Sequence, residues 1–294
     1  MIESAASRIV QSPIAKGVLG IINRVPFPFY RFPITVNGHR MVARTLDRFL
    51  ALWFWKFGVF GAAEVDLLAR LCREGMSVLD IGANVGFHTL LFARSVGAGG
   101  HVWAFEPDPD NFATLCTNLE LNSYRNVTTV QAAVGTATAN GSLYLSPFHC
   151  DHRTYPTGEG QRKIPVAMVS VDDFLPPDQR IDIIKMDIQG AEGMALMGMK
   201  RTLASNPGVV ILMEFWPEGL RKTGTSPELV LSELEKLGFA LYRIDEHTNG
   251  VEKLGNRQTL IGSLAGSGYA NLLVVPEGRV VVVQDAPAVR RSVS

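Results

Sequence analysis

The stretch VLDIGANVGFHT, residues 78–89, decides the fold of this chain. It starts as an apolar run that ends in Asp80, turns tightly at Gly82 and Asn84, and continues from Gly86 as a helical stretch. In such a unit the backbone N–H groups of the turn and the positive end of the helix point to the same place. Residues 78–89 therefore predict a buried strand and a helix that meet at a ligand-binding turn.

The same alternation continues along the rest of the chain. From about residue 75, short β-branched runs alternate with helical stretches, which is typical of a parallel sheet covered by helices on both faces. We therefore predict an α/β fold with a Rossmann-like, doubly wound sheet of seven strands. The expected strands cover 76–81, 101–106, 126–134, 181–188, 208–215, 239–245 and 271–276. The expected helices cover 86–97, 109–121, 191–204 and 226–237.

Three parts of the chain fall outside this alternation. Residues 1–70 contain two apolar, helical stretches around a proline-rich turn region, and we expect them to form a helical N-terminal cap. The main domain should cover 71–284, with a long insertion at 135–180 that holds extra strand candidates. Residues 245–270 are rich in Gly and Asn and should form a loop. A flexible tail is expected at 285–294.

Composition excludes several classes of protein. The 28 basic and 28 acidic residues balance, so the chain lacks the positive surplus of nucleic-acid-binding proteins. Three scattered cysteines build neither a disulfide framework nor a zinc site. The start of the chain has no signal-peptide pattern. The most apolar window, 49–63, contains Lys56 and is shorter than the roughly 20 residues that span a bilayer. We expect a cytoplasmic protein with no nucleic-acid partner and no transmembrane segment.

An acidic residue follows the second expected strand. Glu106 lies 24 residues after Gly82, the place where a carboxylate accepts hydrogen bonds from ribose hydroxyls in a Rossmann-like unit. The dinucleotide fingerprint GxGxxG is absent, because Asn84 stands where close approach of a pyrophosphate needs glycine. Asp80 would also repel a phosphate. These residues favour a nucleoside ligand without a pyrophosphate.

The motif D-x-G-x-N-x-G followed by this acid resembles class I S-adenosylmethionine-dependent methyltransferases. Together with AFEPDPDNF, NLELN and DIIKMDIQGAE, it resembles the FkbM family over residues 60–245. One departure is Gln189, where the family most often has an acid. The resemblance implies S-adenosylmethionine as cofactor and S-adenosylhomocysteine as product. It also implies O-methylation of a hydroxyl on a sugar or a polyketide-type small molecule. The expected cofactor-binding residues are Glu64, Asp80, Gly82, Ala83, Asn84, Gly86, Thr89, Glu106, Pro107, Ala133 and Asp187.

Candidate catalytic residues lie at the carboxyl ends of neighbouring strands. Asp187 closes an apolar strand where the crevice of a doubly wound sheet opens, and Glu214 ends the next strand in the same way. His88 is a further candidate base, because an imidazole titrates near neutral pH. Glu192 is either a site residue or an acid in the first turn of a helix. We expect no metal, although magnesium held by Asp187 and Glu214 is a minority interpretation.

Two hypotheses from other classes stay open. The chain could bind S-adenosylmethionine without catalysis and act as an adaptor, or it could be an NAD-dependent oxidoreductase. The broken dinucleotide fingerprint disfavours the oxidoreductase. The expected partner of the enzyme is a small-molecule or glycan hydroxyl acceptor, and the N-terminal segment could pair two copies of the chain.

Overall fold

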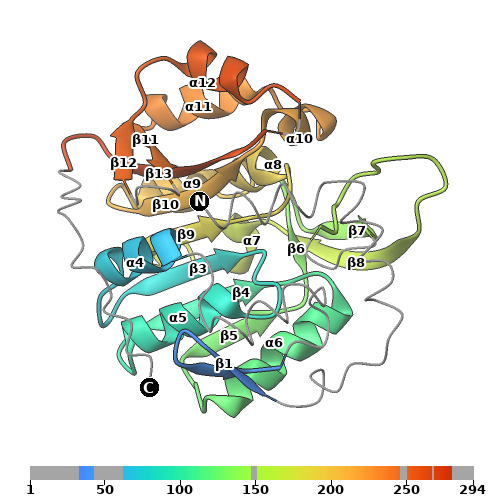
Figure 1. Cartoon of the computed structure of the whole chain (residues 1–294), viewed down its shortest axis with the longest axis vertical. Coiled ribbons are helices and arrows are strands. Elements are labelled where there is room, and N and C mark those ends of the chain that lie inside the picture. The colour runs from blue at the N-terminus through green and yellow to red at the C-terminus, as the bar shows by residue number, and fades with distance from the viewer. Residues whose placement is uncertain (1–32, 43–61, 147–150, 246–249, 267, 280–294) are drawn as a thin grey trace.

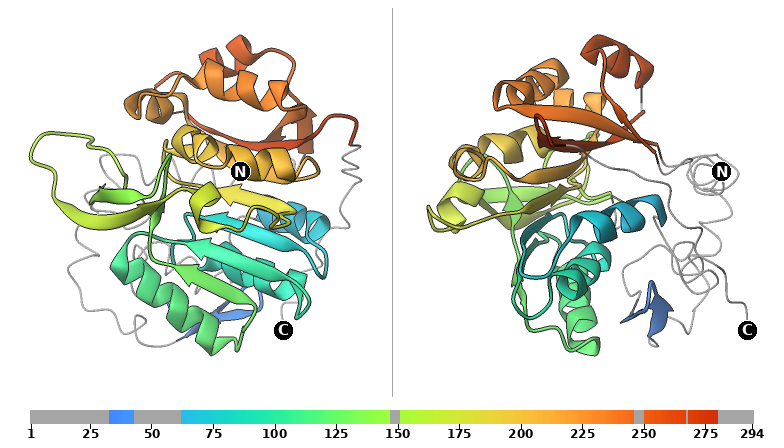
Figure 2. Two further views of the ribbon diagram at one scale, coloured as in Figure 1. Left: turned by 180° about the vertical axis from the view of Figure 1, so that it is seen from behind. Right: turned by 90° about the vertical axis from the view of Figure 1, so that its left-hand side faces the viewer.

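The computed structural model describes residues 33–42, 62–146, 151–245, 250–266 and 268–279. These residues form a central sheet with helices on both faces (Figures 1 and 2). The prediction of an α/β fold is confirmed.

The main sheet has eight strands in the described part of the chain. In sequence order they are β3 (Ser77–Ile81), β4 (His101–Phe105), β5 (Val127–Val130), β9 (Ile183–Met186), β10 (Val210–Phe215), β11 (Phe239–Asp245), β12 (Gly250–Lys253) and β13 (Ala270–Pro276). Their spatial order is β12-β11-β13-β10-β9-β3-β4-β5, and β13 and β12 run in the direction opposite to the other six strands. The chain order changes direction at β3, between β4 and β9, which is the switch point where ligands bind in such sheets.

Consecutive residues of β3 face opposite sides of the sheet and join different cores. Leu79 packs among the helices on one face, whereas Val78 packs on the other. The helices that share a core with the Val78 side are α4 (Ala62–Leu71), α5 (Phe87–Val96) and α6 (Pro109–Leu121). Those on the Leu79 side are α7 (Val171–Phe174), α8 (Glu192–Met197), α9 (Lys200–Ser205), α10 (Pro217–Lys222), α11 (Pro227–Lys236) and α12 (Arg257–Ser263).

The insertion builds a second, smaller sheet. Its strands are β6 (Ala133–Val134), β7 (Ala139–Tyr144) and β8 (Lys163–Val169), in the order β6-β8-β7. The predicted single strand 126–134 is therefore wrong, because the chain turns where the N–H of Ala132 donates to the carbonyl of Val130. β5 stays in the main sheet, while β6 pairs with β8. The chain thereby crosses from one sheet to the other next to the switch point.

Two other predicted elements differ from the structure. The helix expected at 191–204 is broken at Gly198, where a Cβ atom would lie only 2.0 Å from the carbonyl oxygen of Gly135. The loop expected at 245–270 contains β12 and α12. By contrast, α11 begins as expected, because the hydroxyl of Ser226 accepts from the N–H of Leu229 at 3.2 Å.

The described part of the N-terminal segment is a hairpin followed, after residues 43–61, by α4. The strands β1 (Ile34–Val36) and β2 (His39–Met41) are joined by Asn37 and Gly38, both with positive φ, as a tight hairpin turn requires. The remaining stretches of the predicted helical cap, at 1–32 and 43–61, lie outside the described residues, as does the tail beyond residue 279. α4 contributes Leu67 and Leu68 to the core of the main domain.

Candidate active site

The glycine turn, residues 82–86, lies between the carboxyl ends of β4 and β9. The N–H groups of Gly82 and Ala83 donate to the carbonyl of Phe105 at 3.0 and 2.9 Å. Gly82 has a φ of +82°, and a Cβ there would lie 2.1 Å from the carbonyl oxygen of Asp187. No side chain fits in that gap. The close approach of the turn to the end of β9 therefore requires glycine.

Glu106 holds the turn from its other side. Its carboxylate accepts from the N–H of Asn84 at 2.8 Å and from the N–H of Asp108 at 2.9 Å. Asn84 has a φ of +50°, so this hydrogen bond fixes a backbone conformation that non-glycine residues seldom adopt. Burial raises the pKa of Glu106 to about 7, and the two backbone hydrogen bonds oppose that rise.

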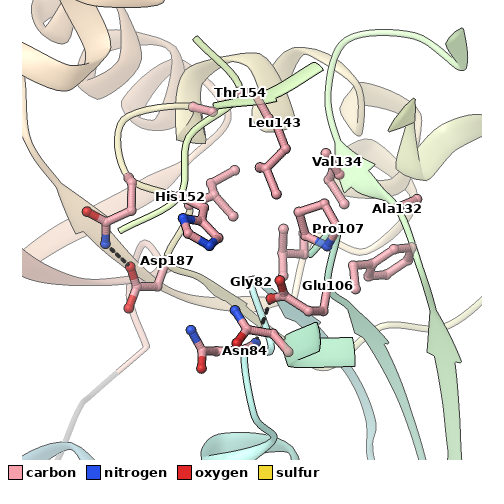
Figure 3. Close-up of a pocket in the computed structure, with 17 residues that line it drawn as sticks. Gly82, Asn84, Glu106, Pro107, Ala132, Val134, Leu143, His152, Thr154 and Asp187 are labelled. Atoms are coloured by element: carbon pink, nitrogen blue, oxygen red, sulfur yellow. Dashed lines mark hydrogen bonds between the residues drawn. The ribbon is translucent and has the colours of Figure 1, made fainter. Parts of the chain in front are cut away.

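A pocket opens between the glycine turn, the start of β6 and the insertion (Figure 3). Six predicted cofactor-binding residues line it: Gly82, Asn84, Glu106, Pro107, Ala133 and Asp187. The other lining residues are Ile81, Phe105, Asn111, Ala132, Val134, Leu143, His152, Thr154, Ile188, Gln189 and Ala191. The pocket combines one apolar wall with carboxylates at two separate places.

Other predicted residues lie behind the turn and do not line this pocket. Asp80 is fully buried, and its carboxylate accepts from the hydroxyl of Thr89 at 2.6 Å. A Cβ at Gly86 would lie 2.6 Å from Leu115. Ala83 is buried in the cluster beneath the turn. These residues brace the turn, and their contact with a cofactor stays a prediction.

The structure does not test the roles predicted for His88 and Glu64. His88 packs edge-on against Phe87 at 4.9 Å between ring centroids, so its role as a base stays a prediction. Glu64 falls within α4, and its side chain lies outside the described residues.

A buried lysine that the sequence analysis did not single out lies under the catalytic candidate. Lys185 of β9 lies opposite Asp80 of β3 in the strand register, and it is only 4% exposed. Its Nζ lies 3.9 Å from the carboxylate of Asp187, which is 45% exposed. The amide of Gln189 donates to the other carboxylate oxygen of Asp187 at 3.0 Å. Asp187 is thus held by a cation and an amide, with one side open to solvent.

Two more carboxyl groups lie close to Asp187. Burial and the charges of Asp187 and Glu192 raise the pKa of Glu214 well above its ordinary value, although Lys185 opposes this. Burial also raises the pKa of Glu192 to about 7. Glu192 accepts from the N–H of Ile188 at 3.0 Å, so it ties the loop after β9 to the first turn of α8. This contact favours the structural interpretation of Glu192.

The insertion contributes a short segment to the wall of the pocket, which we call the strap (residues 151–155). Its even-numbered residues, His152 and Thr154, line the pocket (Figure 3). His152 Nε2 lies 3.6 Å from the carboxylate of Asp108, the N-cap residue of α6. The strap is therefore fastened to the same helix start that Glu106 contacts.

Two odd-numbered residues of the strap, Arg153 and Tyr155, contact the residues that follow β10 and β9. The guanidinium of Arg153 lies 4.6 Å from the ring centre of Trp216 and pairs with Asp151 at 2.5 Å. The hydroxyl of Tyr155 donates to the carbonyl of Gln189 at 2.6 Å. Sequence reasoning missed these residues, because nothing local marks which distant loop an insertion will contact.

The described residues do not form two other kinds of site. None of the described helices is long and apolar enough to cross a bilayer. Within the same ranges, no group of three or more His, Cys, Asp and Glu side chains is arranged to hold a metal ion.

The strand order, the glycine turn after β3 and the acid after β4 define the class I methyltransferase fold. The chain belongs to the FkbM methyltransferase family, because the family model described as "Methyltransferase FkbM domain" matches residues 80–241, more than half of the chain. The resemblance inferred from the motifs is confirmed.

Several curated proteins are similar to parts of this chain. "Hexuronic acid methyltransferase AglP" of Haloferax volcanii is 25% identical over 149 residues, which are 50% of this chain and 59% of that protein. "Methyltransferase 1" of Beauveria bassiana is 28% identical over 144 residues, 42% of this chain and 57% of that protein. "Protein-L-isoaspartate O-methyltransferase" of Methanothrix thermoacetophila is 38% identical over 69 residues, 22% of this chain and 33% of that protein. The matches thus span a third to three fifths of these relatives.

Among solved structures, the methyltransferase FkbM from Methylobacillus flagellatus KT has 16% sequence identity and a TM-score of 0.42. That comparison covers 79% of this chain and 56% of the other chain.

Proposed function

We propose that this chain is an S-adenosylmethionine-dependent methyltransferase that methylates a hydroxyl group of a sugar or a polyketide-type small molecule. The observation that carries the proposal is the glycine turn, whose strained Asn84 is held by the carboxylate of Glu106 at the edge of the pocket. This arrangement suits a ligand that has a ribose but no phosphate.

The residues of the pocket fit this cofactor. Glu106 would accept from the ribose hydroxyls, and the turn from Gly82 to Asn84 would receive the amino-acid part. The apolar wall at 132–134 suits an adenine ring. When bound, the cofactor supplies an electrophilic methyl group on a sulfonium. The pyrophosphate of NAD would lie beside the carboxylates of Glu106 and Asp187 and not beside free backbone N–H groups. The repulsion between these negative charges disfavours NAD.

Asp187 is the residue best placed to receive the acceptor. Its carboxylate lines the pocket and is partly open to solvent, so an incoming hydroxyl can donate to it and pass on its proton as the new C–O bond forms. Gln189 and Lys185 fix the carboxylate in place. Because the methyl group already has a good leaving group, alignment of the oxygen contributes more than strong basicity.

Glu214 has a different proposed role from Asp187. Burial and the charges of Asp187 and Glu192 raise its pKa well above its ordinary value, so we assign Glu214 a hydrogen-bonding role toward the acceptor and not the role of the base.

The acceptor class rests on chemistry and on one relative. A sugar hydroxyl is the acceptor class suggested by the name of the hexuronic acid methyltransferase, which matches half of this chain. The partner we propose is therefore a glycan or small molecule and not a nucleic acid, and we propose that the reaction takes place in the cytoplasm.

Pairing of two chains through the N-terminal segment is part of the same proposal, and light scattering at two protein concentrations would test it.

The decisive experiment is titration calorimetry with S-adenosylhomocysteine. We expect the wild-type chain to bind it and Glu106→Ala to bind it roughly 5- to 100-fold more weakly, the loss of hydrogen bonds to a charged group. Glu120→Ala, an exposed acid on α6, is the matched control and should bind normally. Equal affinity in all three proteins would refute the ribose assignment. A non-catalytic adaptor would bind the cofactor and yet transfer no methyl group to any of a panel of sugars and phenols.

A further inference from the structure

The N-terminal hairpin packs directly against the back of the glycine turn. Val36 and Met41 are 1% and 2% exposed, and they share a core cluster with Ala83 and Val85 of the turn. Residues 34–41 are therefore part of the wall that supports the turn from outside the pocket, although about 40 residues separate the two in sequence.

One side chain joins the hairpin to the turn by hydrogen bonds. Asn118 of α6 is fully buried. Its Oδ1 accepts from the N–H of Val42 at 2.7 Å, and its Nδ2 donates to the carbonyl of Val42 at 3.3 Å. The same Nδ2 donates to the carbonyl of Val85 at 2.8 Å. A single amide thus uses both of its N–H groups and its oxygen to link two backbone segments.

The contact with Val85 completes the support of the strained residue. The N–H of Asn84 is held by Glu106, and the carbonyl of the next residue, Val85, is held by Asn118. Val85 is buried, so without Asn118 its carbonyl would lose a partner away from water, which is costly. The left-handed conformation of Asn84 is therefore fixed from both sides.

A second asparagine, the C-cap residue of the same helix, contacts the hairpin but not the turn. Asn122, one helical turn further along α6, accepts from the N–H of Arg40 at 3.0 Å and donates to its carbonyl at 2.7 Å. Its other N–H donates to the carbonyl of Asn118. Asn122 therefore reproduces the grip on the hairpin without the contact to Val85.

We propose that Asn118 is a positioning residue that couples docking of the hairpin to the shape of the cofactor turn. A docked hairpin would then strengthen cofactor binding, and bound cofactor would stabilise the docked hairpin. The inference rests on the proposed function, because it requires a ligand in the pocket that Gly82, Asn84 and Glu106 line. Such coupling is reciprocal: if a docked hairpin raises cofactor affinity, bound cofactor must slow undocking of the hairpin.

The wild-type protein provides the first test, by hydrogen exchange with and without saturating S-adenosylhomocysteine. The N–H of Val42, held by Asn118, should exchange several-fold more slowly with the ligand, as should the N–H of Arg40. These residues lie outside the pocket lining, so direct contact with the ligand does not account for their protection. Binding without any change in exchange at 39–42 would overturn the coupling alone. Absence of binding would overturn the proposed function and the coupling with it.

The second test compares Asn118→Ala with Asn122→Ala by calorimetry and thermal unfolding. Both variants lose hydrogen bonds to the hairpin and should unfold at lower temperature. We expect Asn118→Ala to lose cofactor affinity by about tenfold and Asn122→Ala to lose clearly less, because Asn118→Ala weakens the hairpin contact and also releases Val85. Unchanged affinity in Asn118→Ala, or an equal loss in both variants, would overturn the assignment to Asn118. If Asn118→Ala does not fold, Asn118→Ser and the exchange experiment decide the question by the same criteria.

Discussion

Replacement of Glu106 by glutamine should change how the stability of the protein depends on pH. Burial raises the pKa of this carboxyl group from its ordinary value of 4.5 to about 7 in the folded protein. The folded state therefore binds a proton more tightly than the unfolded chain does. Stability from this group is fully present below pH 4.5, and it is lost as the pH rises through 7.

The size of this effect follows from the two pKa values. Between pH 4 and pH 8.5, ionisation of Glu106 should lower the free energy of unfolding by about 3 kcal/mol. Glutamine does not ionise and avoids this loss. The difference in free energy of unfolding between Glu106→Gln and the wild type should therefore shift by about 3 kcal/mol in favour of the variant across this pH interval. This shift does not depend on which of the two proteins is more stable at low pH.

Urea denaturation at half-unit intervals of pH would measure this difference. The other titrating groups, including Glu192 and Glu214, are common to both proteins and should largely cancel. Glu120→Gln, an exposed acid, should stay parallel to the wild type at all pH values. A stability difference for Glu106→Gln that does not vary with pH would refute the claim that burial, and not hydrogen bonding, dominates the charge state of Glu106.

The remaining predictions concern binding and turnover. Affinity for S-adenosylhomocysteine should rise roughly three- to tenfold between pH 6 and pH 8, because ribose hydroxyls donate to the ionised form of Glu106; calorimetry at several pH values would show a flat profile if the ribose lies elsewhere. Gly82→Ala should abolish measurable binding and lower stability by at least about 1 kcal/mol, since its Cβ would overlap the carbonyl of Asp187; a normal melting temperature and normal affinity would contradict the close approach. Asp187→Asn should lower kcat by roughly two to four orders of magnitude with little change in cofactor affinity, and kinetics near the wild type would remove Asp187 from the reaction. EDTA should leave turnover intact, whereas strict dependence on magnesium would make Asp187 and Glu214 its ligands.

The central part of the fold could be predicted because each step had a local signal. Apolar β-branched runs mark the buried strands, and Gly82 and Gly86 mark the positions where the backbone must turn or pack closely. The hairpin also had such a signal, Asn37-Gly38 between ITV and HRM, although the prolines before it drew attention to the turn region as a whole.

The parts of the site that were missed depend on contacts between distant segments. Lys185 interrupts an apolar strand, and a lysine inside a buried strand is a signal for function that periodicity alone does not weigh. Arg153 and Trp216 gave no such signal, since they meet only after the insertion folds back over the sheet. The role of Asp80 also had no local signal. Its side chain either contacts a ligand or stabilises the turn, and the choice depends on how deeply Asp80 is buried in the folded chain.

Neighbouring side chains of the strap lie in different environments, and this limits how substitutions there can change the pocket. Residues 152 and 154 form part of the pocket wall, whereas Arg153 and Tyr155 contact the residues that follow β10 and β9. Deleting one residue here would shift side chains between these two environments and would disturb both the pocket wall and the anchoring contacts. Substitutions at 152 and 154 would therefore change the pocket wall itself, whereas substitutions at 153 and 155 would change how the strap is anchored to the loops beside the pocket.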